Sequence, residues 1–198
     1  MTIKQNDPYA SSRRDVVRFD SAEGGRPVDW YQIILRVVHI LAGVFWVGTA
    51  IFVFVYLQPS VKELGPTGQQ FMGHLVEKKK IPVVILAAGA VTILAGILLY
   101  WRASNGFDLD WISSATGVAF TVGGVAAILA FVFGLILVKP AMGRMGSIGQ
   151  AIAMSGGPPT DAQVSEMQKL GARLALIGQI NLLLLIVAVV AMAIARFL

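Results

Sequence analysis

The segment Ile81–Trp101 reads IPVVILAAGAVTILAGILLYW and contains no Asp, Glu, Lys or Arg. A helix needs about 20 such residues to cross the roughly 30 Å hydrocarbon core of a bilayer. Three further uncharged segments are long enough to do the same: Val37–Val61, Trp111–Val138 and Leu174–Ala195. The sequence therefore predicts an all-α integral membrane protein with four transmembrane helices.

The composition agrees with this fold class and excludes several others. The 198 residues are 56% hydrophobic and 14% charged, whereas soluble domains average about 45–50% and 25%. The absence of cysteine excludes disulfides, thiolate metal sites and covalently attached haem. The basic residues form no stripe, so we expect the lipid bilayer, and no nucleic acid, as a partner. The expected location is the bacterial inner (cytoplasmic) membrane, as a multi-pass protein.

The boundaries follow from where charges and turn residues interrupt the apolar segments. We expect a polar N-terminal tail over residues 1–28 and a membrane domain over 29–198. The four spans are expected at about 30–57, 81–101, 112–138 and 173–197. They would form an antiparallel four-helix bundle of two helical hairpins, in which a short link, 102–110, joins the second and third spans and longer links follow the first and third. Segments 58–80 and 139–172 are expected to form helical extensions on one side, here called the headpiece.

Two similar motifs precede the second and fourth spans. Thr67–Gln70 and Thr160–Gln163 both read Thr-x-x-Gln, which is the capping-box pattern of a helix start. Each Gln lies ten residues before a basic residue at the membrane surface, Lys80 or Arg173. Both spans are therefore predicted to begin about four helical turns outside the membrane, giving two hairpins of similar plan, the first kinked at Pro82.

His39 is the strongest candidate for chemistry, because ionisable residues inside a membrane are costly and usually functional. It shares one helix face with Arg36, Gly43 and Trp46. A neutral imidazole there can ligate the iron of haem b. Arg36 would bind haem propionates, Gly43 would give the macrocycle room to approach, and Trp46 completes the face predicted to bind the cofactor. In the alternative interpretation, His39 hydrogen-bonds to a neighbouring helix and Arg36 only extends to the membrane surface.

Depths in antiparallel helices indicate which residues could supply a second axial ligand. Thr92, residues 122–124 and Val187 are expected opposite His39, and none is a strong ligand. Met192 lies about one turn away in depth and could supply a thioether, although methionine also fills apolar cores. Gln179 and Asn181 are expected to hydrogen-bond between helices, with a quinone site as the lesser interpretation.

The headpiece contains a second set of donor atoms. Met72, His74, Met142 and Met145 carry the thioether and imidazole groups that Cu(I) accepts. The alternative is that these methionines line ordinary apolar helix faces and that His74 is a surface residue.

The first span also resembles two bacterial families. The pattern Leu35-Arg36-x-x-His39, continuing through Trp46-x-Gly48 to Tyr56-Leu57-x-Pro59, is similar to the first span of the CopD-like copper-resistance membrane proteins and of the HemJ-like membrane protoporphyrinogen oxidases. The resemblance implies that His39 is a haem-ligating or catalytic histidine and that Trp46 is a packing position. Arg36 stands where HemJ-like proteins usually carry Lys. Their later Trp-x-His-x-Lys motif is absent here, so the resemblance implies a separate branch more than either named activity.

Three functions are compatible with these residues. The first is a small membrane haem b protein for electron transfer or haem and porphyrin handling, with His39 as axial ligand. The second is copper uptake or tolerance through the headpiece donors. The third is a non-catalytic structural subunit of a larger membrane complex. An enzymatic role is left open and would be that of a membrane oxidoreductase. Quinone, other membrane subunits and a second copy of the chain are the remaining candidate partners.

Overall fold

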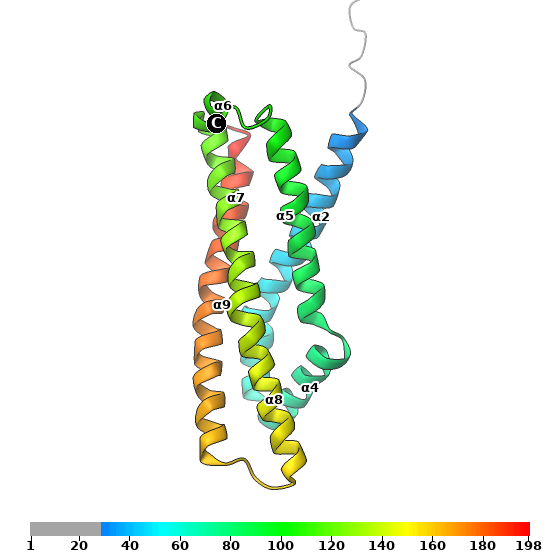
Figure 1. Cartoon of the computed structure of the whole chain (residues 1–198), viewed down its shortest axis with the longest axis vertical. Coiled ribbons are helices and arrows are strands. Elements are labelled where there is room, and N and C mark those ends of the chain that lie inside the picture. Colours follow the sequence, from blue (N-terminus) through cyan, green and yellow to red (C-terminus); the bar gives the residue numbers. More distant parts are fainter. Residues whose placement is uncertain (1–28) are drawn as a thin grey trace, which may run out of the picture. The chain divides into compact units, whose positions relative to one another are not determined.

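Long apolar helices make up most of the computed structural model, which describes residues 29–198 (Figure 1). The first apolar segment comprises α2 (Trp30–Phe52), the π-helical turn η1 (Val53–Leu57) and α3 (Gln58–Glu63). Next come α4 (Gly65–Gly73), the π-helical turn η2 (His74–Lys78) and α5 (Ile81–Ala103). The second half contains α6 (Leu109–Ser113), α7 (Ala115–Phe133), η3 (Gly134–Val138), α8 (Lys139–Ser155) and α9 (Asp161–Ala195). The expected tail, 1–28, lies outside the described residues.

Four helices in the described part are long and apolar enough to cross a membrane. They cover Trp30–Glu63, Ile81–Ala103, Ala115–Ser155 and Asp161–Ala195. Their outward faces are apolar: Leu41, Leu94 and Leu183 are 66%, 63% and 62% exposed. Such exposure is unfavourable in water over so large an area and normal in lipid. The prediction of an all-helical chain with four helices of transmembrane length is confirmed for residues 29–198.

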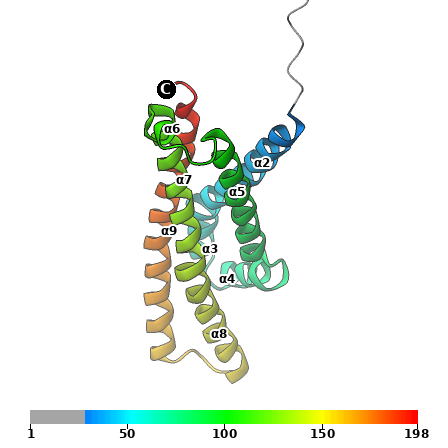
Figure 2. The same ribbon diagram turned by 45° about the horizontal axis from the view of Figure 1, so that its top comes forward.

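The tightest helix pairing is between α7 and α9, which lie side by side in both views (Figures 1 and 2). Small side chains line this contact. Both helices bury several alanines: Ala119, Ala126, Ala127 and Ala130 on α7, and Ala188, Ala191 and Ala195 on α9. Small side chains let the two backbones approach closely, which is the kind of packing that stabilises helix pairs in lipid.

The capping motif before the fourth span has the predicted structure. The Thr160 side chain accepts a hydrogen bond from the Gln163 N–H, and the Gln163 side chain accepts one from the Thr160 N–H. From there α9 runs unbroken for 35 residues to Ala195. The prediction that this helix begins well before its uncharged segment is confirmed.

The matching prediction for the first motif is wrong. Thr67 lies inside α4 and caps nothing, because that helix already begins at Gly65 with a proline in its first turn. The chain is also not one continuous helix from there into α5. Lys80 adopts the left-handed conformation, with φ of 51°, and α5 starts afresh at Ile81. Pro82 therefore sits in the first turn of α5, where its missing N–H costs nothing, and does not kink a longer helix.

Two of the π-helical turns share a cause that can be read in the sequence. η1 ends two residues before Pro59 and η3 ends two residues before Pro140. A proline inside an α-helix lacks the N–H and clashes with the carbonyl four residues earlier. In both places the residue before the proline donates its N–H five residues back instead, Gln58 to Val53 and Lys139 to Gly134. The wider turn keeps the helix continuous past the proline.

One ion pair joins the two headpiece helices of the second half. Arg144 on α8 donates two hydrogen bonds to the Glu166 carboxylate on α9, at 2.7 and 3.2 Å. Hydrogen bonding by Arg144 lowers the pKa of Glu166, and the carboxylate in turn raises the pKa of Arg144. Both side chains are largely exposed, so the pair orients the helices more than it stabilises them.

Candidate functional site

The ring of His39 bonds across to α5. Its Nδ1 lies 2.8 Å from the carbonyl oxygen of Thr92. Because a carbonyl only accepts hydrogen bonds, Nδ1 must carry the hydrogen. In a neutral ring the lone pair is then on Nε2, and no second hydrogen bond to the ring is present among residues 29–198. Thr92 was expected opposite His39 from depth alone, and that register is confirmed.

Two glycines lie where α2 and α5 meet at this point, and only one of them, Gly96, leaves no room for a side chain. A Cβ atom at position 96 would lie 2.9 Å from His39 Cε1 and 3.2 Å from its Nδ1. A Cβ atom at position 43 would meet Thr92 Cγ2 at 3.4 Å, an ordinary contact. The imidazole therefore rests against the bare backbone of Gly96. Thr92 directs its own hydroxyl to the Ala88 carbonyl at 2.8 Å and does not compete for the ring.

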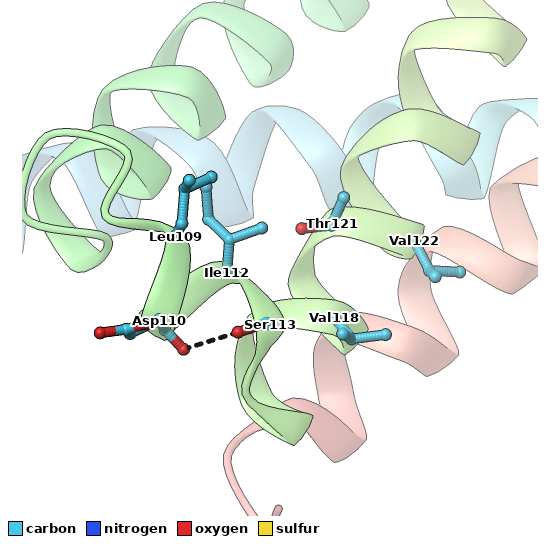
Figure 3. Close-up of a pocket in the computed structure, with 7 residues that line it drawn as sticks. All are labelled: Leu109, Asp110, Ile112, Ser113, Val118, Thr121 and Val122. Atoms are coloured by element: carbon cyan, nitrogen blue, oxygen red, sulfur yellow. Dashed lines mark hydrogen bonds between the residues drawn. The ribbon is translucent and has the colours of Figure 1, made fainter.

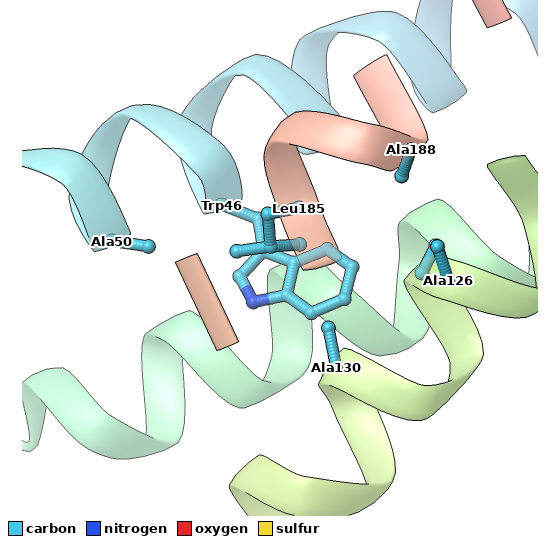
Figure 4. Close-up of a cluster of buried hydrophobic side chains, with 7 residues drawn as sticks. Trp46, Ala50, Ala126, Ala130, Leu185 and Ala188 are labelled. Atoms are coloured by element: carbon cyan, nitrogen blue, oxygen red, sulfur yellow. The ribbon is translucent and has the colours of Figure 1, made fainter. Parts of the chain in front are cut away.

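Trp46 continues the same face of α2 but belongs to the protein core. Its side chain is 5% exposed and packs with Ala126, Ala130 and Leu185 (Figure 4). Its ring also rests against Gly89 of α5, whose absent side chain leaves the space for it. The indole is thus enclosed by protein atoms, as the packing role implied by the resemblance requires.

The remaining residues predicted for the haem site lie in different surroundings. Arg36 is exposed, one helical turn from His39 towards the start of α2. Met192 packs in the α7–α9 contact, where its Cγ would lie 2.9 Å from a Cβ atom at Gly123. The structure therefore brings His39, Gly43 and Thr92 together and gives Met192 a packing role in another helix pair.

The copper candidates divide between two headpiece segments. Met72 is in α4 and the exposed His74 opens η2, whereas Met142 and Met145 are in α8. Among residues 29–198 no group of three or more His, Cys, Asp or Glu side chains is arranged to hold a metal ion. The copper set stays a prediction.

The two amides of α9 do not form the expected bonds between helices. Gln179 is exposed. Asn181 is 9% exposed, and its Oδ1 is buried without a hydrogen-bond partner in the described structure. Phe54 contacts Gly178, and Trp46 packs with Leu185, so Asn181 lies between these two contacts along α9. The amide could be recognised in the sequence, but the apolar packing on either side of it, Phe54 at Gly178 and Trp46 at Leu185, could not.

A hollow of about 460 Å³ opens beside α6 and the start of α7 (Figure 3). It is lined by Leu109, Asp110, Ile112, Ser113, Val118, Thr121 and Val122. Aromatic rings support the neighbouring chain: Tyr100 bonds to Thr121 through their hydroxyls at 2.6 Å and meets Trp111 edge-on. No motif in the sequence indicates this hollow. Neither His39 nor Arg36 lines it.

Comparison of the chain with protein-family models, curated proteins and solved structures gives no match. The functional argument therefore rests on the residues of this chain.

Proposed function

We propose that the chain is a four-span membrane protein of the bacterial inner membrane, arranged as an antiparallel bundle, that holds haem b through His39. The hydrogen bond from His39 Nδ1 to the Thr92 carbonyl carries the proposal. Histidines that ligate metals commonly donate their other ring N–H to a carbonyl, which fixes the tautomer and raises the basicity of the ligating nitrogen. In hydrocarbon, a ring nitrogen left without a partner is costly, so a ligand at Nε2 gives this residue its purpose.

The surroundings of the ring fit a macrocycle in two respects. The imidazole is only half-buried: its Nδ1 and Cε1 atoms face α5, and part of its surface is left exposed. Next to it, the exposed side of α2 is apolar, with Ile40 and Leu41 57% and 66% exposed. Arg36 lies one turn nearer the membrane surface, where a guanidinium can hydrogen-bond to propionates. When bound, haem would supply one-electron chemistry, with its potential adjusted by ligand identity and by burial.

The proposal concerns a five-coordinate site, or a six-coordinate site whose second ligand comes from outside this chain. Met192 supports no part of it, because its thioether side chain packs against Gly123. A second copy or another membrane subunit would supply both the further ligand and the cover for the open side. Two roles are open to such a site. One is electron transfer, for example with a quinone, and the other is haem and porphyrin handling.

The test compares the two histidines of the chain. The protein is produced in a haem-sufficient host, purified in detergent, and its reduced-minus-oxidised visible spectrum is recorded. We expect a Soret band and an α band in the wild type and in His74→Ala, but not in His39→Ala. His74 is the matched control, because it is an exposed headpiece histidine. A circular dichroism spectrum shows whether His39→Ala keeps its helices.

Two results would overturn the proposal. One is a wild-type protein that stays colourless and takes up no added haemin. The other is a haem spectrum that survives unchanged in a folded His39→Ala protein.

A further inference from the structure

We propose that Lys78, Lys79 and Lys80 form a binding surface for the headgroups of anionic phospholipids. The inference depends on membrane insertion of α5 and not on haem. The three lysines are the only run of three consecutive basic residues in the sequence, and all three side chains are exposed. The uncharged helix α5 begins at the next residue, Ile81. With α5 in a bilayer, these lysines lie at the level of the headgroups.

No acidic side chain within the described residues is paired with these lysines. None of them forms an ion pair among residues 29–198, and only Glu77, beside Lys78 in sequence, offers a nearby acid. The headpiece as a whole is also positive: segments 58–80 and 139–172 contain seven Lys or Arg against four Asp or Glu. Of these, Arg144 and Glu166 neutralise each other. Clusters of Lys and Arg next to a span are attracted to anionic lipids, each residue by roughly fivefold in affinity.

The backbone conformation of Lys80 indicates that the residue is there for its charge and not for the turn it makes. Its φ of 51° is a left-handed conformation, which glycine adopts without cost and a lysine adopts only at a cost. The turn from η2 into α5 would therefore be made better by glycine. A lysine at this position makes sense if its ammonium group is used.

The test measures retention of phosphatidylglycerol against phosphatidylcholine by the full chain. The protein is purified in detergent, mixed with either lipid, and analysed by native mass spectrometry and by thermal unfolding. We expect the wild type to prefer phosphatidylglycerol, and K78Q/K79Q/K80Q to lose roughly a hundredfold of that preference. High salt should reduce it as well.

Lys80→Gly is the discriminating variant. It should bind phosphatidylglycerol about fivefold more weakly, yet unfold in phosphatidylcholine at the same or a higher temperature, because the strained backbone is relieved. Arg196→Gln is the control. It removes one positive charge at the C-terminal end of α9, away from the lysine run in sequence, and should keep the preference for phosphatidylglycerol. The proposal is overturned if the wild type does not distinguish the lipids, if the triple variant keeps its preference, or if Arg196→Gln loses as much as Lys80→Gly. The haem spectrum should be the same in all these variants, so failure of one proposal leaves the other testable.

Discussion

The imidazole of His39 rests on Gly96, and a methyl group at position 96 would come within 2.9 Å of its Cε1 atom. Real Cβ atoms do not approach so closely, so the ring would have to move. The same contact shows how little space separates α2 and α5 here. Substitutions at Gly96 and at Gly43, the two glycines between α2 and α5, therefore test whether the position of the imidazole matters for haem binding.

Gly96→Ala should displace the imidazole and weaken its bond to the Thr92 carbonyl. Changes to such supporting contacts typically cost about 10–100-fold in metal affinity, so we expect haem binding to weaken by that factor in a haemin titration. Gly43→Ala is the control, since its Cβ would make only an ordinary 3.4 Å contact with Thr92. Equal haem affinity in both variants would contradict this account.

Asn181→Leu should stabilise the protein. Its buried Oδ1 lacks a hydrogen-bond partner in the described structure, and an unsatisfied buried polar group costs about 1–3 kcal/mol. Leucine has a similar size and no such group. Thermal unfolding in detergent should show the gain. Gln179→Leu serves as comparison and should change little, because that amide is already exposed in the folded chain. A loss of stability in Asn181→Leu would show that the amide has a partner.

The two Thr-x-x-Gln motifs should respond differently to the same substitution. Thr160→Ala removes a capping box and should cost about 1 kcal/mol, seen as faster hydrogen exchange in the first turn of α9. Thr67→Ala changes a residue inside α4 that caps nothing, so exchange there should hardly change. Equal protection losses at the two sites would mean that both threonines act as caps.

The Arg144–Glu166 pair predicts a pH dependence confined to the headpiece. Since its pKa is lowered in the folded state, Glu166 contributes stability above its unfolded pKa and loses that contribution as the pH falls through the folded value. Contact between α8 and α9 should therefore loosen in acid, as the pH falls below the ordinary range of a glutamate pKa, by a small amount for so exposed a pair. Hydrogen exchange at neutral and acidic pH measures this, and Glu166→Gln should abolish the difference at both helices.

Uncharged length and capping chemistry explain why much of this structure could be predicted. The segment Ile81–Trp101 carries no charge, and a single segment can cross lipid only as a helix, because a helix satisfies its own backbone hydrogen bonds. Depth counting at 1.5 Å per residue was enough to place Thr92 opposite His39. Thr160 could be recognised because its motif is followed by a continuous helical pattern.

The errors arose where a local pattern competes with its neighbours. Thr67 carries the same motif, but Pro66 is a stronger helix-start signal one residue earlier. The left-handed residue at the start of α5 is Lys80 and not the glycine or asparagine that usually marks such a turn, so the sequence did not indicate it. The packing role of Met192 depends on Gly123, which is distant in sequence and lies on another helix. Such contacts follow from how helices meet, and the periodicity of one helix does not contain them.

The π-helical turns before Pro59 and Pro140 act as phase shifts. A π-helical turn amounts to one residue inserted into an α-helix, and one residue corresponds to about 100° of rotation about the axis. The side of α3 or α8 that would otherwise continue the inward stripe of α2 or α7 is thereby turned away from it. Deleting one residue within Val53–Leu57 would restore the α-helical phase, but it would turn the headpiece face by the same angle and press the proline ring against the carbonyl behind it. The prolines thus set the angular offset between the faces that each long helix presents before and after its π-helical turn.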